Sequence, residues 1–346
     1  MDTAGNDGEL QNSGAFKLKF KKFVKSKIFT LLIFLVLMVA YFWYFSPNNS
    51  YLGIRNITSI LNSMVLYILF AVAVSMPILF GEFDLSPGYI GTAAGATMAT
   101  IMSVSNIPWF IVIIICLMLG VAFGMLNGLL VNKFRIQSFI ATLAVGSFIA
   151  RGVSYIIPSG RAIVIDDPVI AWIGTFRIGG IVPVTVIISL VVITVYGIIL
   201  AKTKFGRSIY LCGGSRQAAR LAGLNPTRLS YILFANSGML GALAGLLLAA
   251  RLKTGDLSGT NAYAFPAVTA VIFGGISFGG GSGNMLGCFL GLLIINGFQN
   301  GLTIMRVTPY WQDVAAGILL LLALTLDYFT KRRALSAGVK KASKLR

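Results

Sequence analysis

The sequence predicts an all-α polytopic membrane protein, a bundle of about ten transmembrane helices of which some are broken. Of its 346 residues, 57% are hydrophobic and 11% are charged, whereas an ordinary soluble domain carries about 25% charged residues. The hydrophobic residues fall into repeated runs of about 20, the length with which a helix crosses a bilayer. These runs are too long, and alternate too weakly, for the strands of an outer-membrane barrel.

Short polar segments divide the apolar runs, so each run is expected to form one span. Polar, basic tails are predicted at 1–27 and 331–346, with a single transmembrane domain over 28–330. The longest outer loop is expected at 158–180, and the longest inner loop at 201–228. The expected spans are Ile28–Phe45, Ile57–Phe80, Gly88–Val104, Pro108–Val131, Ser138–Ile157, Ile181–Leu200, Leu229–Ala250, Ala264–Gly280, Met285–Met305 and Trp311–Thr330.

Basic residues set the expected orientation of the bundle. The net charge is +18, and 21 of the 28 Lys and Arg residues fall in the two tails or in the loops at 132–137 and 201–228. Cytoplasmic segments of membrane proteins carry such an excess, which predicts that both termini are cytoplasmic. The N-terminal tail is expected to lie on the anionic lipid of the inner leaflet. Because orientation explains the charge, no nucleic-acid partner is predicted.

Two features of the spans bear on how they pack. Gly88–Val104 and Ala264–Gly280 are short, which predicts helices that are broken or partly re-entrant. Glycines also recur four residues apart, and small residues at this spacing let helix backbones approach closely in lipid. The bundle is therefore expected to be tight. The glycine sets are Gly91/Gly95, Gly120/Gly124/Gly128, Gly241/Gly245 and Gly287/Gly291.

The segment Gly81–Gly88, GEFDLSPG, interrupts the apolar sequence between the second and third spans. It carries Glu82 and Asp84, two of only ten acidic residues, and a charge at membrane depth faces a cavity, a partner or the interface. Ser86 and Pro87 match the N-cap and the first position of a new helix. Two interpretations stay open: a tight cytoplasmic turn with solvated carboxylates, or a helix break beside a translocation path.

Uncharged polar side chains lie within three other spans. Such groups usually bond one helix to another inside a bundle, and this is the favoured interpretation of each one alone. Together they could also line a route for a polyhydroxylated solute. They are Thr142, Asn236, Asn296, Gln299 and Asn300.

A short helix is predicted inside the basic loop at 201–228. Ser215 can cap it by accepting from a free backbone N–H, and Gly223 suits a left-handed helix end. Between them, apolar residues spaced i, i+3 and i+4 share one face. One interpretation is a helix that docks into a groove on another protein; the other is a solvated loop whose arginines only fix topology. The apolar face consists of Ala218, Leu221 and Ala222.

No catalytic or metal site is predicted. The chain has no histidine, and Cys116, Cys212 and Cys288 form no C-x-x-C pair, so neither the commonest metal ligand nor a disulfide framework is indicated. The glycine-rich stretch at 273–284 lacks the Lys-Ser/Thr ending of a phosphate-binding loop. ATP hydrolysis is therefore not expected from this chain.

Five stretches of the chain match, in order, the segments of one known family. GEFDLSPGYIGTAAG resembles the Gly-Gly-Ile-Asp-Leu-Ser-Val-Gly segment of ABC importer permeases for ribose and related monosaccharides, and QSFIATLAVGSFIARG resembles their Pro-x-Phe-Ile-Ala-Thr-Leu segment. GRSIYLCGGSRQAARLAGLNPTRL resembles their cytoplasmic loop, which carries Gly-x-Asn-x-x-Ala-Ala-Arg-Leu-Ser-Gly-Ile. FGGISFGGGSGNMLGCFLG and YWQDVAAGILLLLALTLD resemble their C-terminal spans. Departures from the first motif, at Glu82, Phe83 and Pro87, leave the identity of the sugar open.

The resemblance implies the permease of a binding-protein-dependent ABC importer, a homodimer in the prokaryotic plasma (inner) membrane. An ATPase subunit would bind Mg-ATP, so no cofactor is expected on this chain, and a solute-binding protein would deliver a small solute, expected to be a monosaccharide. The loop helix would fit a cleft on the ATPase. The implied ATPase-coupling residues are Ser215, Arg216, Gln217, Ala218, Ala219, Arg220, Leu221, Ala222, Gly223 and Leu224.

Alternatives to this function also stay open. The cargo could be a nucleoside or an amino acid, because the binding protein shares in selecting it. The chain could also work alone as a secondary transporter in which Glu82 or Asp84 couples protons, although that leaves the docking helix unexplained. The candidate residues of the translocation pathway are Glu82, Asp84, Ser86, Thr142, Asn236, Asn296, Gln299 and Asn300.

Overall fold

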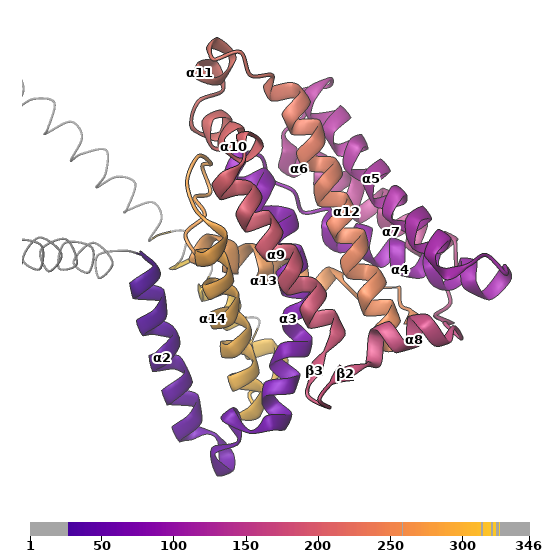
Figure 1. The fold of residues 1–346 in the computed structure, drawn as a ribbon, viewed down its shortest axis with the longest axis vertical. Helices are drawn as coiled ribbons and strands as arrows, with labels where there is room; N and C mark the ends of the chain where they lie inside the picture. The colour runs from indigo at the N-terminus through magenta and orange to yellow at the C-terminus, as the bar shows by residue number, and fades with distance from the viewer. Residues whose placement is uncertain (1–26, 258, 313, 320, 323–324, 326–346) are drawn as a thin grey trace, which may run out of the picture.

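The structure, a computed structural model, describes residues 27–257, 259–312, 314–319, 321–322 and 325. These residues form a helical bundle (Figure 1), which confirms the predicted all-α class. Seven of the described helices are long and apolar enough to cross a membrane. The expected tails, apart from Lys27, and much of the tenth expected span, Trp311–Thr330, lie outside the described residues.

Long helices run through the bundle, and short elements join them. The longer helices are α2 (Lys27–Phe45), α3 (Ile54–Phe80), α4 (Pro87–Val104), α5 (Trp109–Asn132), α9 (Val184–Lys202), α12 (Pro226–Leu252), α13 (Asn261–Phe273) and α14 (Met285–Ile304). A further long helix is continuous through α6 (Ser138–Ala144), the π-helical η2 (Val145–Ala150) and α7 (Arg151–Ile156). The short elements are η1 (Pro47–Leu52), β1 (Ile163–Val164), α8 (Pro168–Thr175), β2 (Arg177–Ile178), β3 (Val182–Pro183), α10 (Lys204–Gly214), α11 (Arg216–Leu221) and β4 (Thr254–Gly255).

The two ends of the bundle carry different short elements. The end at the top of Figure 1 carries α10 and α11, and the opposite end carries η1, α8 and the hairpin of β2 and β3. We call them the α11 end and the η1 end. At the η1 end, β1 pairs antiparallel with β4, and β2 with β3.

The segment 158–180, expected to be a loop, contains the helix α8. Asp167 caps this helix by accepting hydrogen bonds of 2.9 Å from the backbone N–H groups of Val169 and Ile170, and Pro168 occupies the first helical turn. An Asp followed by Pro is a helix-start pattern, which hydropathy alone does not register. The sixth span begins three residues later than expected and ends two residues later, because residues 182–183 belong to β3 and α9 is Val184–Lys202.

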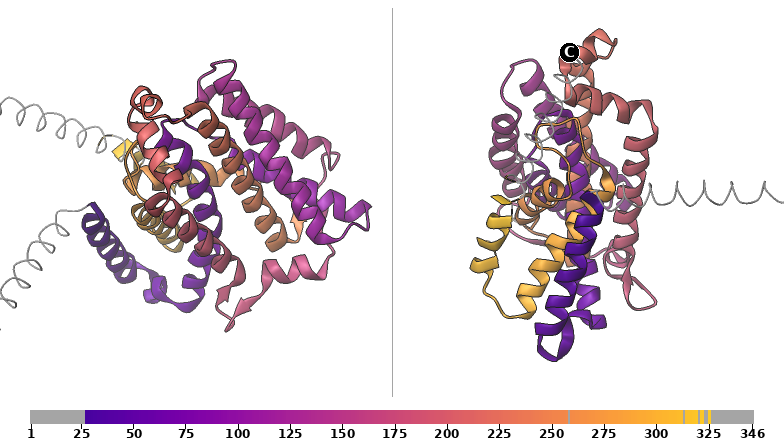
Figure 2. Two further views of the ribbon diagram at one scale, coloured as in Figure 1. Left: turned by 45° about the horizontal axis from the view of Figure 1, so that its top comes forward. Right: turned by 90° about the vertical axis from the view of Figure 1, so that its left-hand side faces the viewer.

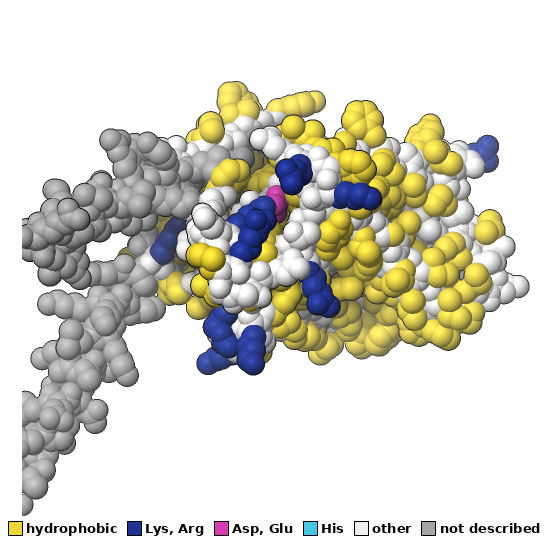
Figure 3. Space-filling model, turned by 90° about the horizontal axis from the view of Figure 1, so that it is seen from above, with side chains coloured by type: hydrophobic (Ala, Val, Ile, Leu, Met, Phe, Trp, Pro, Cys, Tyr) yellow, Lys and Arg dark blue, Asp and Glu magenta, His cyan; other side chains and the backbone are white. Residues whose placement is uncertain are grey.

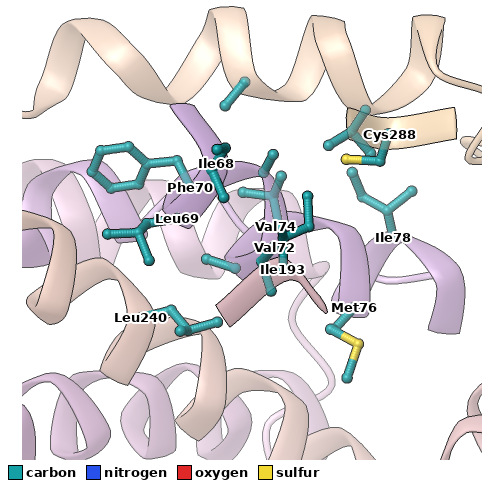
Figure 4. Packing of buried hydrophobic residues seen from close by; sticks show 14 of the residues in the cluster. Ile68, Leu69, Phe70, Val72, Val74, Met76, Ile78, Ile193, Leu240 and Cys288 are labelled. Atoms are coloured by element: carbon teal, nitrogen blue, oxygen red, sulfur yellow. The ribbon is translucent and has the colours of Figure 1, made fainter. Parts of the chain in front are cut away.

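The core of the bundle surrounds α3. Every residue from Met64 to Phe80 is buried, as expected of a helix that is apolar on all sides. The helices α9, α12, α13 and α14 all pack against it. Figure 4 shows α3 side chains among Ile193 of α9, Leu240 of α12 and Cys288 of α14. This enclosure holds the segment that follows α3, residues 81–86, against the rest of the bundle.

Helix α2 lies at the edge of the bundle, where it packs on α14 (Figure 2). The ring of Phe42 fits against Gly301 of α14, at which an added Cβ would lie 2.4 Å from the ring. Tyr51 of η1 donates a hydrogen bond of 3.0 Å to the carbonyl oxygen of Gly297. These contacts attach the first span to the last helices of the described bundle.

Glycines bring α12 into close backbone contact with α4 and α5. A Cβ added to Gly245 of α12 would lie 1.8 Å from the carbonyl oxygen of Gly91 on α4. One added to Gly238 would lie 2.1 Å from the carbonyl oxygen of Gly120 on α5. Close approach through small residues substitutes in lipid for the hydrophobic driving force that packs soluble helices. The tight packing predicted from the glycine spacing is confirmed.

We expect Gly245→Val to lower the free energy of unfolding by about 3 kcal/mol, because a side chain there meets backbone that cannot rotate away. The measurement is thermal unfolding of the purified protein in detergent. Gly152→Val in α7 is the matched control, since no atom lies within 4 Å of a Cβ added there. Equal melting temperatures for the two variants would contradict the packing argument.

Two helices, α4 and α13, begin inside the bundle. Pro87, the first residue of α4, lies against Gly241 near the middle of α12. The hydroxyl of Thr260, which precedes α13, donates to the carbonyl oxygen of Gly88. The starts of the two helices therefore meet, as expected if the third and eighth spans are broken.

Helix α13 is also shorter than the eighth expected span. It has 13 residues and ends at Phe273, so its length is about 20 Å, against about 30 Å for the hydrocarbon core of a bilayer. The prediction that this helix reaches Gly280 is wrong. Gly275 adopts a φ of +103°, which lies outside the right-handed helical region and ends the helix.

Candidate functional site

The short helix predicted in the basic loop is present as α11. The Ser215 hydroxyl accepts a hydrogen bond of 3.2 Å from the backbone N–H of Ala218, and Gly223 has a φ of +78°. Both end signals behave as predicted. The helix ends at Leu221, so the last three candidate coupling residues, Ala222–Leu224, follow it, the first two in a turn.

The two faces of α11 differ in burial. Ala219 of the helix is buried, and Leu224, which follows the helix, is partly buried against the main core. The opposite, predicted apolar face is exposed, with Leu221 at 86% relative exposure and Ala218 and Ala222 also exposed. Helix α11 lies at the top of the bundle in Figure 1. Because Leu221 is so exposed there, this face is available to a partner.

The helix α10 was not predicted from the sequence. Thr203 caps it by accepting a hydrogen bond of 3.1 Å from the backbone N–H of Gly206. Its buried face includes Ile209 and Cys212, and Tyr210 donates a 2.9 Å hydrogen bond to the carbonyl oxygen of Gly283. The apolar spacing i, i+3 was the available signal, but the surrounding glycine and basic residues concealed it.

The segment after α3 brings two of the predicted groups together. Gly81 ends α3 with a φ of +85°, and the next residue, Glu82, forms an ion pair with Arg216 of α11. The Arg216 guanidinium also lies 5.0 Å from the ring centre of Phe80, within the range of a cation–π contact. A candidate pathway residue is thus bonded to a candidate coupling residue.

Asp84 lies fully inside the bundle, with 0% exposure. One carboxylate oxygen, Oδ1, accepts hydrogen bonds of 2.9 Å from the backbone N–H and 2.6 Å from the hydroxyl of Ser86. Asn127 of α5, which the sequence reasoning missed, donates a 2.8 Å hydrogen bond to that hydroxyl. The interpretation of this segment as a turn with solvated carboxylates is therefore wrong for Asp84, because a buried carboxylate needs hydrogen-bond donors of this kind.

Ser86 occupies the predicted N-cap position of α4, and Pro87 opens the helix. The Ser86 hydroxyl makes no capping bond to the helix backbone, since it is engaged with Asp84 and Asn127. Helix α6 supplies acceptors for the preceding backbone. Phe83 N–H donates 2.9 Å to Ser138, and Leu85 N–H donates 3.2 Å to Thr142. These side chains give the backbone N–H groups of Phe83 and Leu85 acceptors inside the bundle, where no helix satisfies them.

The remaining candidate pathway residues do not join this group. Asn236 accepts from Tyr196 of α9, and Asn296 donates 3.1 Å to the carbonyl oxygen of Ile60. Two further pairs bond α14 to other elements: Gln299 accepts from Tyr67 at 2.8 Å, and Asn300 accepts from Asn56 at 2.8 Å. These contacts agree with the helix-bonding interpretation of these amides.

A cavity of about 740 Å³ opens beside α11. Its lining includes Glu82 and three arginines, Arg135, Arg216 and Arg220. Figure 3, viewed onto the α11 end, shows basic side chains gathered around an acidic one. The cavity is therefore basic, and it lies between the break after α3, the start of α12 and the loop that leads into α6.

Comparison with known proteins adds to this geometry. Residues 56–324 match the family model described as branched-chain amino acid transport system / permease component. The chain is 33% identical to the ribose import permease protein RbsC of Haemophilus influenzae, over 88% of this chain and 94% of that protein. It is 34% identical to RbsC of Bacillus subtilis, over 81% of this chain and 87% of that protein. It is 32% identical to the L-arabinose transport system permease protein AraH of Escherichia coli, over 73% of this chain and 76% of that protein. No solved structure matches it.

Proposed function

The chain belongs to the family of permease components of branched-chain amino acid transport systems, and from this premise we propose that it forms the membrane pathway of an ABC importer for a monosaccharide. The exposed face of α11 is the observation that carries this proposal, because a transporter that works alone has no use for it. A separate ATPase would hydrolyse ATP, and a solute-binding protein would deliver the solute.

The proposed cargo is based on the names of the similar permeases. Proteins named as ribose and L-arabinose permeases are similar to this chain over most of its length. The family description names branched-chain amino acids instead, which makes an amino acid the second candidate. A monosaccharide is the better-supported cargo because the similarity to the ribose permeases covers 81% to 88% of this chain.

The proposed topology has about ten spans with both termini in the cytoplasm. Tails at 1–27 and 331–346 flank a membrane domain at 28–330, in which 201–228 is the cytoplasmic coupling loop. The charge bias supports this orientation, as does the presence of α10, α11 and the basic cavity at one end of the bundle. A second copy of the chain would complete the permease as a homodimer.

In the proposed mechanism, α11 and its flanking residues, 215–224, fit a cleft on the ATPase. ATP binding would move that subunit, and α11 would transmit the movement to the bundle as a rigid-body rearrangement. The chain itself makes or breaks no bond in the solute. Its contributions are the docking face of α11 and, at the break after α3, polar groups that a rearrangement could expose to the solute.

The test is reconstitution of the chain in liposomes with an ABC ATPase subunit and a solute-binding protein from the same genome. We expect uptake of labelled ribose or arabinose that requires ATP and both partners. Labelled leucine serves as the competing cargo. Solute uptake by the chain alone, driven by a proton gradient, would instead identify a secondary transporter, and leucine uptake without sugar uptake would reverse the choice of cargo.

A further inference from the structure

We propose that Glu82 is a positioning residue for transport: through its ion pair with Arg216 it ties the docking helix α11 to the break that precedes α4. This inference rests on the proposed function and names the connection by which movement of α11 reaches the interior of the bundle. The contacts of Arg216 and those of the segment that contains Glu82 support this inference.

One partner of the ion pair, Arg216, is the first residue of α11. Arg216 is half-exposed, with 48% side-chain exposure, whereas the Glu82 side chain is 8% exposed. Arg216 also lies over the ring of Phe80 in the last turn of α3. The ion pair therefore connects a solvent-facing helix, α11, to the residue that follows the deeply buried helix α3.

On the other side, Glu82 is two residues from Asp84, and the whole segment is held by hydrogen bonds to separate helices. Phe83 and Leu85 donate from their backbone N–H groups to side chains of α6. Asp84 reaches Asn127 of α5 through Ser86, and Pro87 then begins α4. A displacement of Arg216 would thus act on a short segment to which α3, α4, α5 and α6 are all attached.

The unequal burial of the two partners separates this role from a purely structural one. Removing Arg216 leaves a buried carboxylate without its partner, which is strongly destabilising. Removing the charge of Glu82 leaves an arginine that water can solvate, which costs little. A structural role therefore predicts that Glu82→Gln is close to wild type in every assay, whereas a positioning role predicts a stable protein whose transport is uncoupled from ATP hydrolysis.

The experiment measures sugar taken up per ATP hydrolysed, in liposomes that contain the permease, its ATPase and its binding protein. Wild type, Glu82→Gln, Glu82→Asp and the exchanged pair Glu82→Arg/Arg216→Glu are compared. We expect Glu82→Gln to retain the ATPase subunit and ATP hydrolysis but to lower this ratio about tenfold. Glu82→Asp, which keeps the charge, should lower it less, and the exchanged pair should restore it to within about threefold of wild type.

Asp166→Asn is the matched control, because it makes the same chemical change at an exposed residue near the η1 end. The ratio of sugar taken up to ATP hydrolysed does not depend on how much protein folds. A lower yield of the Glu82→Gln variant therefore does not affect the result. A wild-type ratio in Glu82→Gln overturns the inference while the proposed function stands. Absence of ATP-driven uptake in the wild type overturns the proposed function, and the inference with it.

Discussion

Leu221→Asp is expected to abolish ATP-driven uptake while leaving the fold of the permease unchanged. Leu221 is 86% exposed on α11, so the substitution removes no contact within the described bundle. If this leucine enters an apolar cleft of the ATPase, a carboxylate there is desolvated without a partner. Substitution of a central interface residue of this kind costs about 2–4 kcal/mol of binding free energy, which corresponds to a loss of affinity of roughly 30-fold to 1,000-fold.

The measurement has two parts. Co-purification of the ATPase with the tagged permease reports docking, and thermal unfolding in detergent reports the fold. Lys204→Glu is the control, because it changes the charge by two units at an exposed residue in the first turn of α10, where a carboxylate is tolerated. We expect the control to retain the ATPase and Leu221→Asp to lose it at an unchanged melting temperature. Retention of the ATPase by Leu221→Asp would contradict docking through the apolar face of α11.

The arrangement of spans was largely predictable because lipid imposes a simple rule. A backbone in hydrocarbon must satisfy its own hydrogen bonds, so each long apolar run becomes a helix, and α2, α3, α5, α9, α12 and α14 all lie where such runs predict. The elements at the ends follow other rules. Helix α8 depends on an Asp-Pro start and α10 on a short amphipathic pattern, and a scan for apolar runs detects neither.

The candidate site was predictable only in its local parts. The cap at Ser215 and the left-handed Gly223 are determined by neighbouring residues, and both were predicted. The ion pair between Glu82 and Arg216 joins residues 134 positions apart, so its existence depends on how α10 and α11 fold back over α3. Asn127 was missed, although it lies on the same buried face of α5 as Gly120 and Gly124. The glycine spacing was the signal that could have found it.

Asp84→Ala is expected to lower the free energy of unfolding by about 3 kcal/mol. The Asp84 carboxylate accepts both hydrogen bonds that Ser86 donates to it, and it lies where no water reaches it. Alanine leaves the Ser86 N–H and hydroxyl without their acceptor, and each buried unsatisfied group costs about 1–3 kcal/mol. The loss should appear as a lower melting temperature, with Asp166→Ala, an exposed carboxylate near the η1 end, as the control.

Asp84→Asn separates the hydrogen-bonding role of this residue from a role of its charge. Asparagine keeps an acceptor at the position of Oδ1, and its amide group can donate to Ser237, which lies close to the Asp84 carboxylate. We therefore expect stability within about 1 kcal/mol of wild type and retained ATP-driven uptake. Proton-coupled transport requires a group that gains and loses a proton, which an amide does not. Loss of all uptake in a stable Asp84→Asn variant would therefore show that the carboxylate itself takes part in transport, and would return the secondary-transporter mechanism to consideration.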